Sequence, residues 1–208
     1  MRVSDSNRVL FVHVPKTGGS TIDLMFDHEV PDSRRVPERQ RHAPLNRLID
    51  AEPDLATYWT FGFVRNPWAR MVSWWTMIHQ VFELVEAGDP AAIRKVEKHP
   101  TAWLPEGEFR NDFDGFVLEG TAAIAKVGRP QRRTLTAPGR EPDFVGRVEN
   151  FTDDYNVVRE RLGLPPVEKA PRKNVTRHRH YSEYYNDTTR AHVAAIFAPD
   201  IEAFGYEF

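Results

Sequence analysis

Residues 8–21 read RVLFVHVPKTGGST, and this stretch decides the fold of the chain. The residues up to Val14 are mostly β-branched or aromatic and stop at Pro15, which predicts a largely buried strand. The residues from Lys16 to Thr21 predict a tight turn into a helix. Such a turn directs backbone N–H groups and the helix dipole at one point, which suits a phosphate or a sulfonate. Lys16 adds a positive charge there, although a purely structural turn is the alternative, since glycine has many backbone uses.

The order of residues in this turn argues against ordinary nucleotide hydrolysis. The pattern GxxxxGK[ST], typical of enzymes that hydrolyse ATP or GTP, places its lysine after the glycines. Here Lys16 precedes Gly18 and Gly19. The turn therefore predicts an anion site of another kind.

A second strand-to-helix unit is found in residues 59–75, which read WTFGFVRNPWARMVSWW. Residues 59–64 predict a strand, and Asn66 followed by a proline predicts the start of a helix. Arg65 follows the strand directly, and Ser73 lies about two turns into the helix. Arginine offers a planar fork of donors and serine a hydroxyl, which together suit a phosphate monoester. Taken alone, Arg65 is more simply interpreted as an arginine paired with a nearby carboxylate, and Ser73 as a solvated serine.

The rest of the chain continues the alternation of strands and helices. Residues 143–148 predict a third strand, and residues 153–162 predict the helix after it. Residues 83–120 show mixed helical patterns, and residues 121–142 predict a loop rich in arginine, proline and glycine. Residues 186–187 predict the cap of a C-terminal helix. We expect an α/β fold whose middle third faces the substrate.

Composition narrows the function classes. The 208 residues fit a single domain over residues 1–208. A formal net charge of -2 gives no global basic field, so we expect no nucleic-acid partner. Cysteine is absent, which excludes disulfides, thiolate zinc sites and a cysteine nucleophile. The apolar run near the start is far shorter than the roughly 20 residues of a membrane span, so we expect no anchor and a soluble, cytoplasmic protein.

The two units together resemble the cofactor motifs of sulfotransferases that use 3′-phosphoadenosine 5′-phosphosulfate (PAPS). The likeness is to the carbohydrate, heparan-sulfate type, and VLFVHVPKTGGSTI (residues 9–22) and FGFVRNPWARMVSWW (residues 61–75) carry it. It extends to residues 143–164 and 180–208. The resemblance implies a P-loop-NTPase-like three-layer fold in which helices flank a central parallel sheet. Without cysteine or an anchor, the chain looks like a soluble, bacterial-type member.

The resemblance also implies roles for individual residues. In the family, the first motif binds the 5′-phosphosulfate of PAPS and the second binds its 3′-phosphate. Carried over to this chain, the first role falls on Lys16, Thr17, Gly18, Gly19, Ser20 and Thr21, and the second on Arg65 and Ser73. The product of the donor would be 3′,5′-ADP, and the acceptor would be a hydroxyl of a carbohydrate or glycoconjugate rather than of a steroid or phenol.

Sulfonyl transfer needs a nucleophilic hydroxyl, an in-line path and stabilisation of the departing phosphate oxygen, and none of these requires a metal. Lys16 is the expected partner of the leaving oxygen, by analogy with phosphoryl transfer. His42 is the expected general base, because imidazole titrates near neutral pH and His42 lies between the two motifs. Glu29 and Glu38 are the reserve candidates, since similar sulfotransferases use either a histidine or a glutamate in this region.

Two basic segments and one further histidine have open roles. Residues 169–180, KAPRKNVTRHRH, are either a solvated basic face or a loop that closes over the nucleotide with Lys173 or Arg177. Arg34, Arg35, Arg39 and Arg41 either face an anionic acceptor or are solvated loop charges. His13, on the first strand, points toward the cofactor or holds a buried, hydrogen-bonded position.

Two other function classes remain open at this point. One is a P-loop-type nucleotide kinase that uses ATP, which the position of Lys16 disfavours. The other is a non-catalytic nucleotide-binding module, which the presence of both Lys16 and His42 disfavours.

Overall fold

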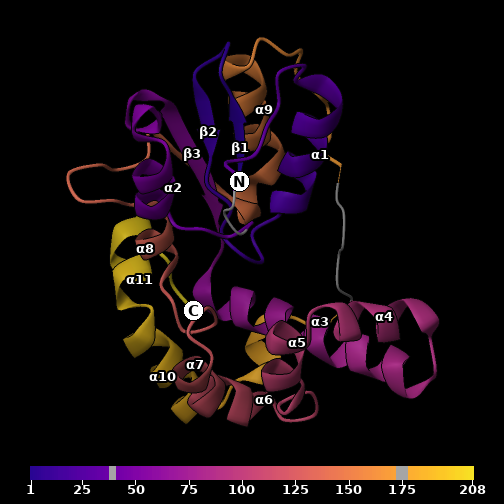
Figure 1. Cartoon of the computed structure of the whole chain (residues 1–208). Coiled ribbons are helices and arrows are strands. Elements are labelled where there is room, and N and C mark those ends of the chain that lie inside the picture. The colour runs from indigo at the N-terminus through magenta and orange to yellow at the C-terminus, as the bar shows by residue number, and fades with distance from the viewer. Residues whose placement is uncertain (38–40, 172–177) are drawn as a thin grey trace. The chain divides into compact units, whose positions relative to one another are not determined.

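The computed structural model describes residues 1–37, 41–171 and 178–208, and they group into two compact units (Figure 1). Unit 1 consists of Met1–Arg65 and Gln131–Val175, and unit 2 consists of Asn66–Pro130 and Thr176–Phe208. Each unit has a hydrophobic core of its own. A single domain over residues 1–208 stays a prediction.

Unit 1 is built on a four-stranded sheet whose strands lie in chain order. They are β1 (Arg2–Ser4), β2 (Val9–Phe11), β3 (Trp59–Val64) and β4 (Phe144–Arg147). β1 pairs with β2 in antiparallel fashion, whereas β2, β3 and β4 are parallel to one another. Phe11 stands opposite Phe61, which in turn stands opposite Phe144. This mostly parallel sheet, flanked by helices, confirms the predicted α/β fold of the P-loop-like type.

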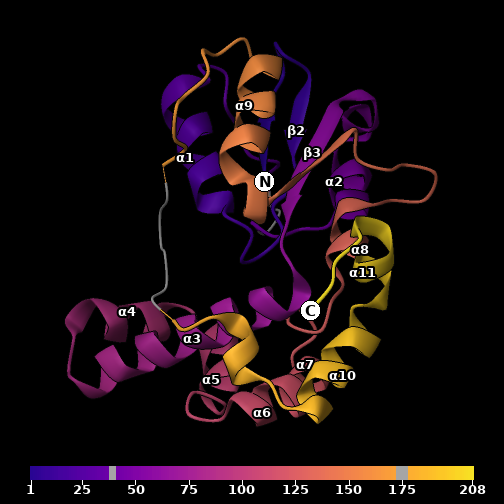
Figure 2. The ribbon, with the colours of Figure 1, turned by 180° about the vertical axis from the view of Figure 1, so that it is seen from behind.

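The helices of unit 1 cover the sheet. They are α1 (Gly19–Glu29), α2 (Leu45–Ala51), α8 (Gln131–Leu135) and α9 (Phe151–Arg161), with 3₁₀ turns at Pro53–Thr57 and Val148–Asn150. α1 and α9 lie side by side (Figure 2). Phe11, Phe61 and Phe63 share one face of the sheet, because side chains alternate along a strand, and they belong to one buried cluster with Phe26 of α1 and Tyr155 of α9.

Strand β1 was not indicated by the sequence. Arg2 is buried, and its guanidinium donates to Asp23 and Asp27 of α1 over 3.2 and 2.5 Å. The hydroxyl of Ser4 donates to Asp32 over 2.8 Å. A three-residue strand with two polar residues has no hydrophobic alternation, which is the signal that sequence analysis uses.

Two other predicted segments need correction. The strand expected over residues 8–14 is only Val9–Phe11, although the Val12 N–H still donates to the Phe61 oxygen over 2.9 Å. Residues 121–142, predicted as a loop, contain the short helices α7 (Thr121–Ala123) and α8. By contrast, the strand predicted over residues 59–64 is confirmed residue for residue as β3.

The described elements of unit 2 are helical. They are α3 (Pro67–Glu86), α4 (Pro90–Lys98), α5 (Pro100–Gly107), α6 (Phe113–Gly115), a π-helical segment (Phe116–Gly120), α7, a 3₁₀ turn (Tyr181–Tyr184), α10 (Asp187–Ile196) and α11 (Ala198–Phe204). Both predicted helix starts are confirmed, because the side chain of Asn66 caps α3 and that of Asn186 caps α10.

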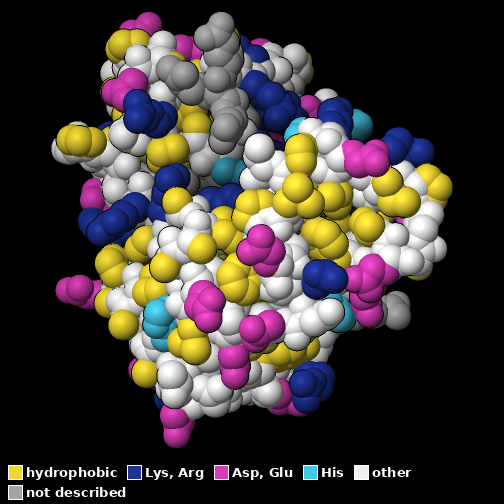
Figure 3. Space-filling view, turned by 60° about the horizontal axis from the view of Figure 1, so that its bottom comes forward, with side chains coloured by type: hydrophobic (Ala, Val, Ile, Leu, Met, Phe, Trp, Pro, Cys, Tyr) yellow, Lys and Arg dark blue, Asp and Glu magenta, His cyan; other side chains and the backbone are white. Residues whose placement is uncertain are grey.

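The core of unit 2 is aromatic. Trp68, Met71 and Ile78 of α3 pack in one cluster with Val193 and Phe197. Large apolar side chains also reach the surface, and Figure 3 shows hydrophobic side chains interspersed with acidic and basic ones on the face it presents. Within the described parts of the chain, no helix combines the length and the apolar character that crossing a membrane requires.

Candidate functional site

The turn between β2 and α1 has an unusual backbone. Lys16 has φ +70° and Gly18 has φ +76°, so both lie in the left-handed region. The hydroxyl of Thr17 donates to the Val14 oxygen over 2.8 Å and closes the turn. Gly18 is the N-cap of α1 and places no side chain over the end of the helix, while its oxygen accepts from the Thr21 N–H over 2.9 Å. An anion can therefore approach the N-terminus of α1 without meeting a capping side chain.

Side chains packed beneath the turn require its two glycines. A Cβ atom on Gly18 would lie 2.7 Å from Cε2 of Phe151, on α9. A Cβ atom on Gly19 would lie 2.1 Å from Nε2 of His13. The turn is thus supported from below, with Gly18 exposed and Lys16 half-buried.

Arg65 follows β3 at the same edge of the sheet as this turn. β2 and β3 are parallel neighbours, so the residues after their last positions leave the sheet on one side. Arg65 is half-buried, and its backbone N–H and C=O are both bonded to the side chain of Gln131. The sequence analysis did not single out Gln131.

The imidazole of His42 lies beside the end of β2. Its Nδ1 is 3.0 Å from the backbone oxygen of His13, and the two imidazole rings are 4.5 Å apart, edge to face. A carbonyl oxygen only accepts, so Nδ1 of His42 carries the proton and Nε2 holds the lone pair. His42 as a whole is exposed, but neighbouring groups keep water from its ring, and this desolvation, assisted by the charge of Arg41, lowers the pKa of His42 to about 4. The ring is therefore neutral at physiological pH, with its lone pair at Nε2, but it titrates below the near-neutral range that the sequence led us to expect.

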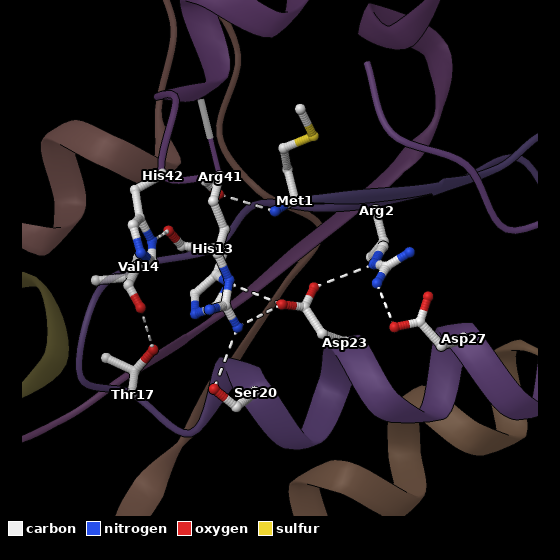
Figure 4. A network of polar contacts seen from close by, with 10 residues as sticks. All are labelled: Met1, Arg2, His13, Val14, Thr17, Ser20, Asp23, Asp27, Arg41 and His42. Carbon is white, nitrogen blue, oxygen red and sulfur yellow. Dashed lines mark hydrogen bonds and ion pairs between the residues drawn. The ribbon is translucent and has the colours of Figure 1, made fainter. Parts of the chain in front are cut away.

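A buried carboxylate, Asp23 of α1, connects this histidine pair to two arginines (Figure 4). It accepts from Arg41 over 2.5 Å and from Arg2 over 3.2 Å, and it lies 3.6 Å from Nδ1 of His13. Arg41 also donates to the hydroxyl of Ser20 over 3.1 Å. Asp23 thus joins the first turns of α1 to the segment that carries His42.

The charges within this group shift the pKa values of its members. Burial lowers the pKa of His13 to about 3. Burial alone would raise the pKa of Asp23, but the contact with His13 and the charge of Arg41 outweigh it and hold that pKa well below its usual range. A neutral His13 beside an ionised Asp23 follows. Asp23 could not be singled out from the sequence, because a single acidic residue in a helix is ordinary.

The reserve bases lie elsewhere or outside the described residues. Glu29 ends α1, roughly 15 Å along the helix axis from Gly19 at 1.5 Å per residue. Both of its carboxylate oxygens accept from Arg159 over 2.8 Å, and the Arg159 guanidinium lowers the pKa of Glu29. Glu38 is outside the described residues, as are Lys173 and Arg177.

The remaining residues that the sequence singled out are distributed over both units. Thr21 donates from its hydroxyl to the Pro171 oxygen over 2.9 Å, which ties α1 to the beginning of the basic segment of residues 169–180. Ser73 is buried in α3 and belongs to unit 2. Arg34 is bonded to both Asp5 and Glu52, which offset its charge. In the part of the chain that the structure describes, no group of three His, Asp or Glu side chains is placed to hold a metal ion.

Comparison with known proteins gives one match. A family model described as the sulfotransferase family matches residues 1–207, which include the turn after β2, His42 and Arg65. No curated protein and no solved structure matches the chain.

Proposed function

Because the chain belongs to the sulfotransferase family, we propose that it transfers the sulfonyl group of PAPS to a hydroxyl group of a carbohydrate or glycoconjugate. One observation carries the proposal. The glycine turn of residues 16–21 and Arg65 follow two adjacent parallel strands, so two groups that suit anions leave the sheet at one edge. The carbohydrate class is supported by the resemblance of residues 9–22 and 61–75 to that type of sulfotransferase.

The residues present fit a nucleotide that carries phosphate groups at both its 5′ and its 3′ positions. The 5′-phosphosulfate would bind at the N-terminus of α1, where Gly18 places no side chain in its way, together with the other members of the turn, Lys16, Thr17, Gly19, Ser20 and Thr21. Arg65 and Ser73 would bind the 3′-phosphate. Lys173 and Arg177 are proposed as further nucleotide contacts, because they follow Pro171, whose oxygen is bonded to Thr21. Transfer by these residues does not require a metal ion.

When bound, PAPS supplies an activated sulfonyl group, which passes to the acceptor oxygen as the bond from sulfur to the 5′-phosphate oxygen breaks. Lys16 stabilises the negative charge that grows on that departing oxygen. His42 accepts the proton of the acceptor hydroxyl at Nε2, the nitrogen left with a lone pair by the bond to His13. The released donor product is 3′,5′-ADP. His42 later returns its proton to water.

The test is transfer of labelled sulfonyl from PAPS to a panel of saccharides, with phenols and steroids for comparison. We expect a labelled saccharide and one equivalent of 3′,5′-ADP, and much slower transfer by Lys16→Ala. A phosphorylated product made from ATP without PAPS would identify a kinase instead. Tight PAPS binding without transfer to any member of the panel would identify a non-catalytic module.

A further inference from the structure

The side chain of Gln131 makes two hydrogen bonds to the backbone of a single residue. Its Oε1 accepts from the Arg65 N–H over 3.0 Å, and its Nε2 donates to the Arg65 oxygen over 2.8 Å. Gln131 is fully buried. Exchanging the amide oxygen and nitrogen would set donor against donor and acceptor against acceptor, so only one orientation of the amide satisfies both atoms.

This pair of bonds imitates a neighbouring strand. The N–H and C=O of one residue in an extended chain point to the same side, and a partner strand normally bonds to both. The last residue of β3 is Val64, which pairs with Arg147 of β4. Arg65 is the next residue, and there the amide of Gln131 takes the place of a strand partner. The backbone of Arg65 is thereby held beyond the end of the sheet.

Helix α8 packs against β3, and this packing holds the side chain of Gln131 in place. Leu135 packs on Gly62, where a Cβ atom would lie 2.2 Å from Cδ2 of the leucine. Gln131 and Leu135 are four residues apart and therefore share a face of α8. That face contacts β3 at Gly62 and the chain directly after it at Arg65.

We propose that Gln131 is a positioning residue that orients Arg65 for recognition of the 3′-phosphate, and so gives the protein its preference for 3′-phosphorylated nucleotides. The direction of the Cα–Cβ bond of Arg65 is set by the backbone that Gln131 holds. Without the amide, the backbone of Arg65 would have to be ordered when the nucleotide binds, at a cost in conformational entropy. This inference rests on the proposed function, in which Arg65 binds the 3′-phosphate.

The experiment compares the affinities of 3′,5′-ADP and 5′-AMP by calorimetry for the native protein and for Gln131→Met, which keeps the shape of the side chain and removes both bonds. We expect the native preference for 3′,5′-ADP to fall by about tenfold in the variant, the equivalent of one net hydrogen bond to a charged group. Affinity for 5′-AMP should change little. Gln131→Glu, which keeps the acceptor but places an oxygen against the Arg65 carbonyl, is the second variant if Gln131→Met does not fold.

Leu135→Ala is the matched control, because it weakens the packing of the same helix and leaves the amide in place. It should lower stability and preserve the nucleotide preference. In an Arg65→Ala background, Gln131→Met should have no further effect on the preference. A full preference in folded Gln131→Met, or an equal loss in Leu135→Ala, overturns the inference. A native protein without any preference would instead overturn the proposed function.

Discussion

The Nδ1 atom of His42 lies 3.0 Å from the backbone oxygen of His13. This one contact fixes the tautomer of His42, because the carbonyl can only accept. Desolvation by neighbouring groups keeps the ring neutral by lowering its pKa to about 4, although His42 is exposed as a residue. A neutral imidazole with its lone pair at Nε2 has the form that a general base requires.

The first prediction concerns this base. His42→Ala should lower kcat by about 100-fold or more, because general-base catalysis typically contributes that much. Binding of 3′,5′-ADP should be almost unchanged, since the base acts on the acceptor hydroxyl. Steady-state kinetics and calorimetry on the same preparation separate the two effects.

The control for this prediction is Glu29→Ala, which should retain turnover because that carboxylate is held by Arg159. In the native enzyme, the acid limb of kcat/KM should appear near pH 4, where His42 becomes protonated, rather than near the ordinary histidine value of 6.5. Loss of turnover in Glu29→Ala or Glu38→Ala, with activity retained in His42→Ala, would assign the base to a carboxylate.

The second prediction is that stability falls as pH is lowered from about 6.5 to about 4. The pKa values of His13 and His42 are depressed to about 3 and about 4 in the folded chain, while the unfolded chain takes up protons near the ordinary value of 6.5. The unfolded state therefore binds more protons in this window, and the free energy of unfolding decreases with falling pH. Asp23 adds a further loss only below its ordinary value of 3.8. Urea unfolding at a series of pH values measures the slope.

His42→Gln is the control for the pH dependence, because glutamine can donate to the His13 oxygen but does not titrate. Its free energy of unfolding should depend less steeply on pH across the same window. A native protein whose urea midpoint is constant from pH 7 to pH 4.5 would show that the pKa values of His13 and His42 are not depressed in the folded chain.

The third prediction separates binding from catalysis at Lys16. Negative charge on the leaving oxygen is larger in the transition state than in the bound donor, so Lys16→Ala should lower turnover more than it weakens PAPS binding. Saturating kinetics give the first quantity, and calorimetry gives the second. A variant with weaker PAPS binding and native turnover would make Lys16 a binding residue only.

The fourth prediction uses the left-handed backbone of Lys16, whose φ is +70°. A residue with a Cβ atom is strained there and glycine is not, so Lys16→Gly should be more stable than Lys16→Ala by about 1 kcal/mol. Both variants lack the ammonium group, so their turnover should be lowered to the same extent. Equal urea midpoints for the two variants would show that the backbone at this position is not left-handed in solution.

The sequence predicted the parts of the fold that have local patterns. β3 stands out because aromatic and β-branched residues fill Trp59–Val64, and the proline after Asn66 marks the start of α3. β1 and α8 have no such pattern. β1 is short and polar, and its Arg2 is buried only because α1 supplies carboxylates for it. Contacts of this kind join residues far apart in the chain and leave no periodicity.

The candidate site also contains some residues that could be predicted from the sequence and others that could not. Lys16 and Arg65 follow strands with clear signals, so their common edge of the sheet could be inferred. Asp23 and Gln131 could not, because each is a single polar residue whose role depends on a distant partner. For Gln131 the only indication in the sequence was Gly62, because a glycine inside a strand often marks a close approach by another part of the chain, and here that part is the helix of Gln131.

The most direct test of the account is the affinity of the native protein for 3′,5′-ADP compared with 5′-AMP, because it examines recognition of the donor without knowledge of the acceptor. We predict that calorimetry finds 3′,5′-ADP bound about tenfold or more tightly, since each charge-assisted hydrogen bond to the 3′-phosphate contributes on the order of 1.5 to 3 kcal/mol. Arg65→Ala should erase that difference. Equal affinity of the native protein for the two nucleotides would contradict the assignment of PAPS as the sulfonyl donor.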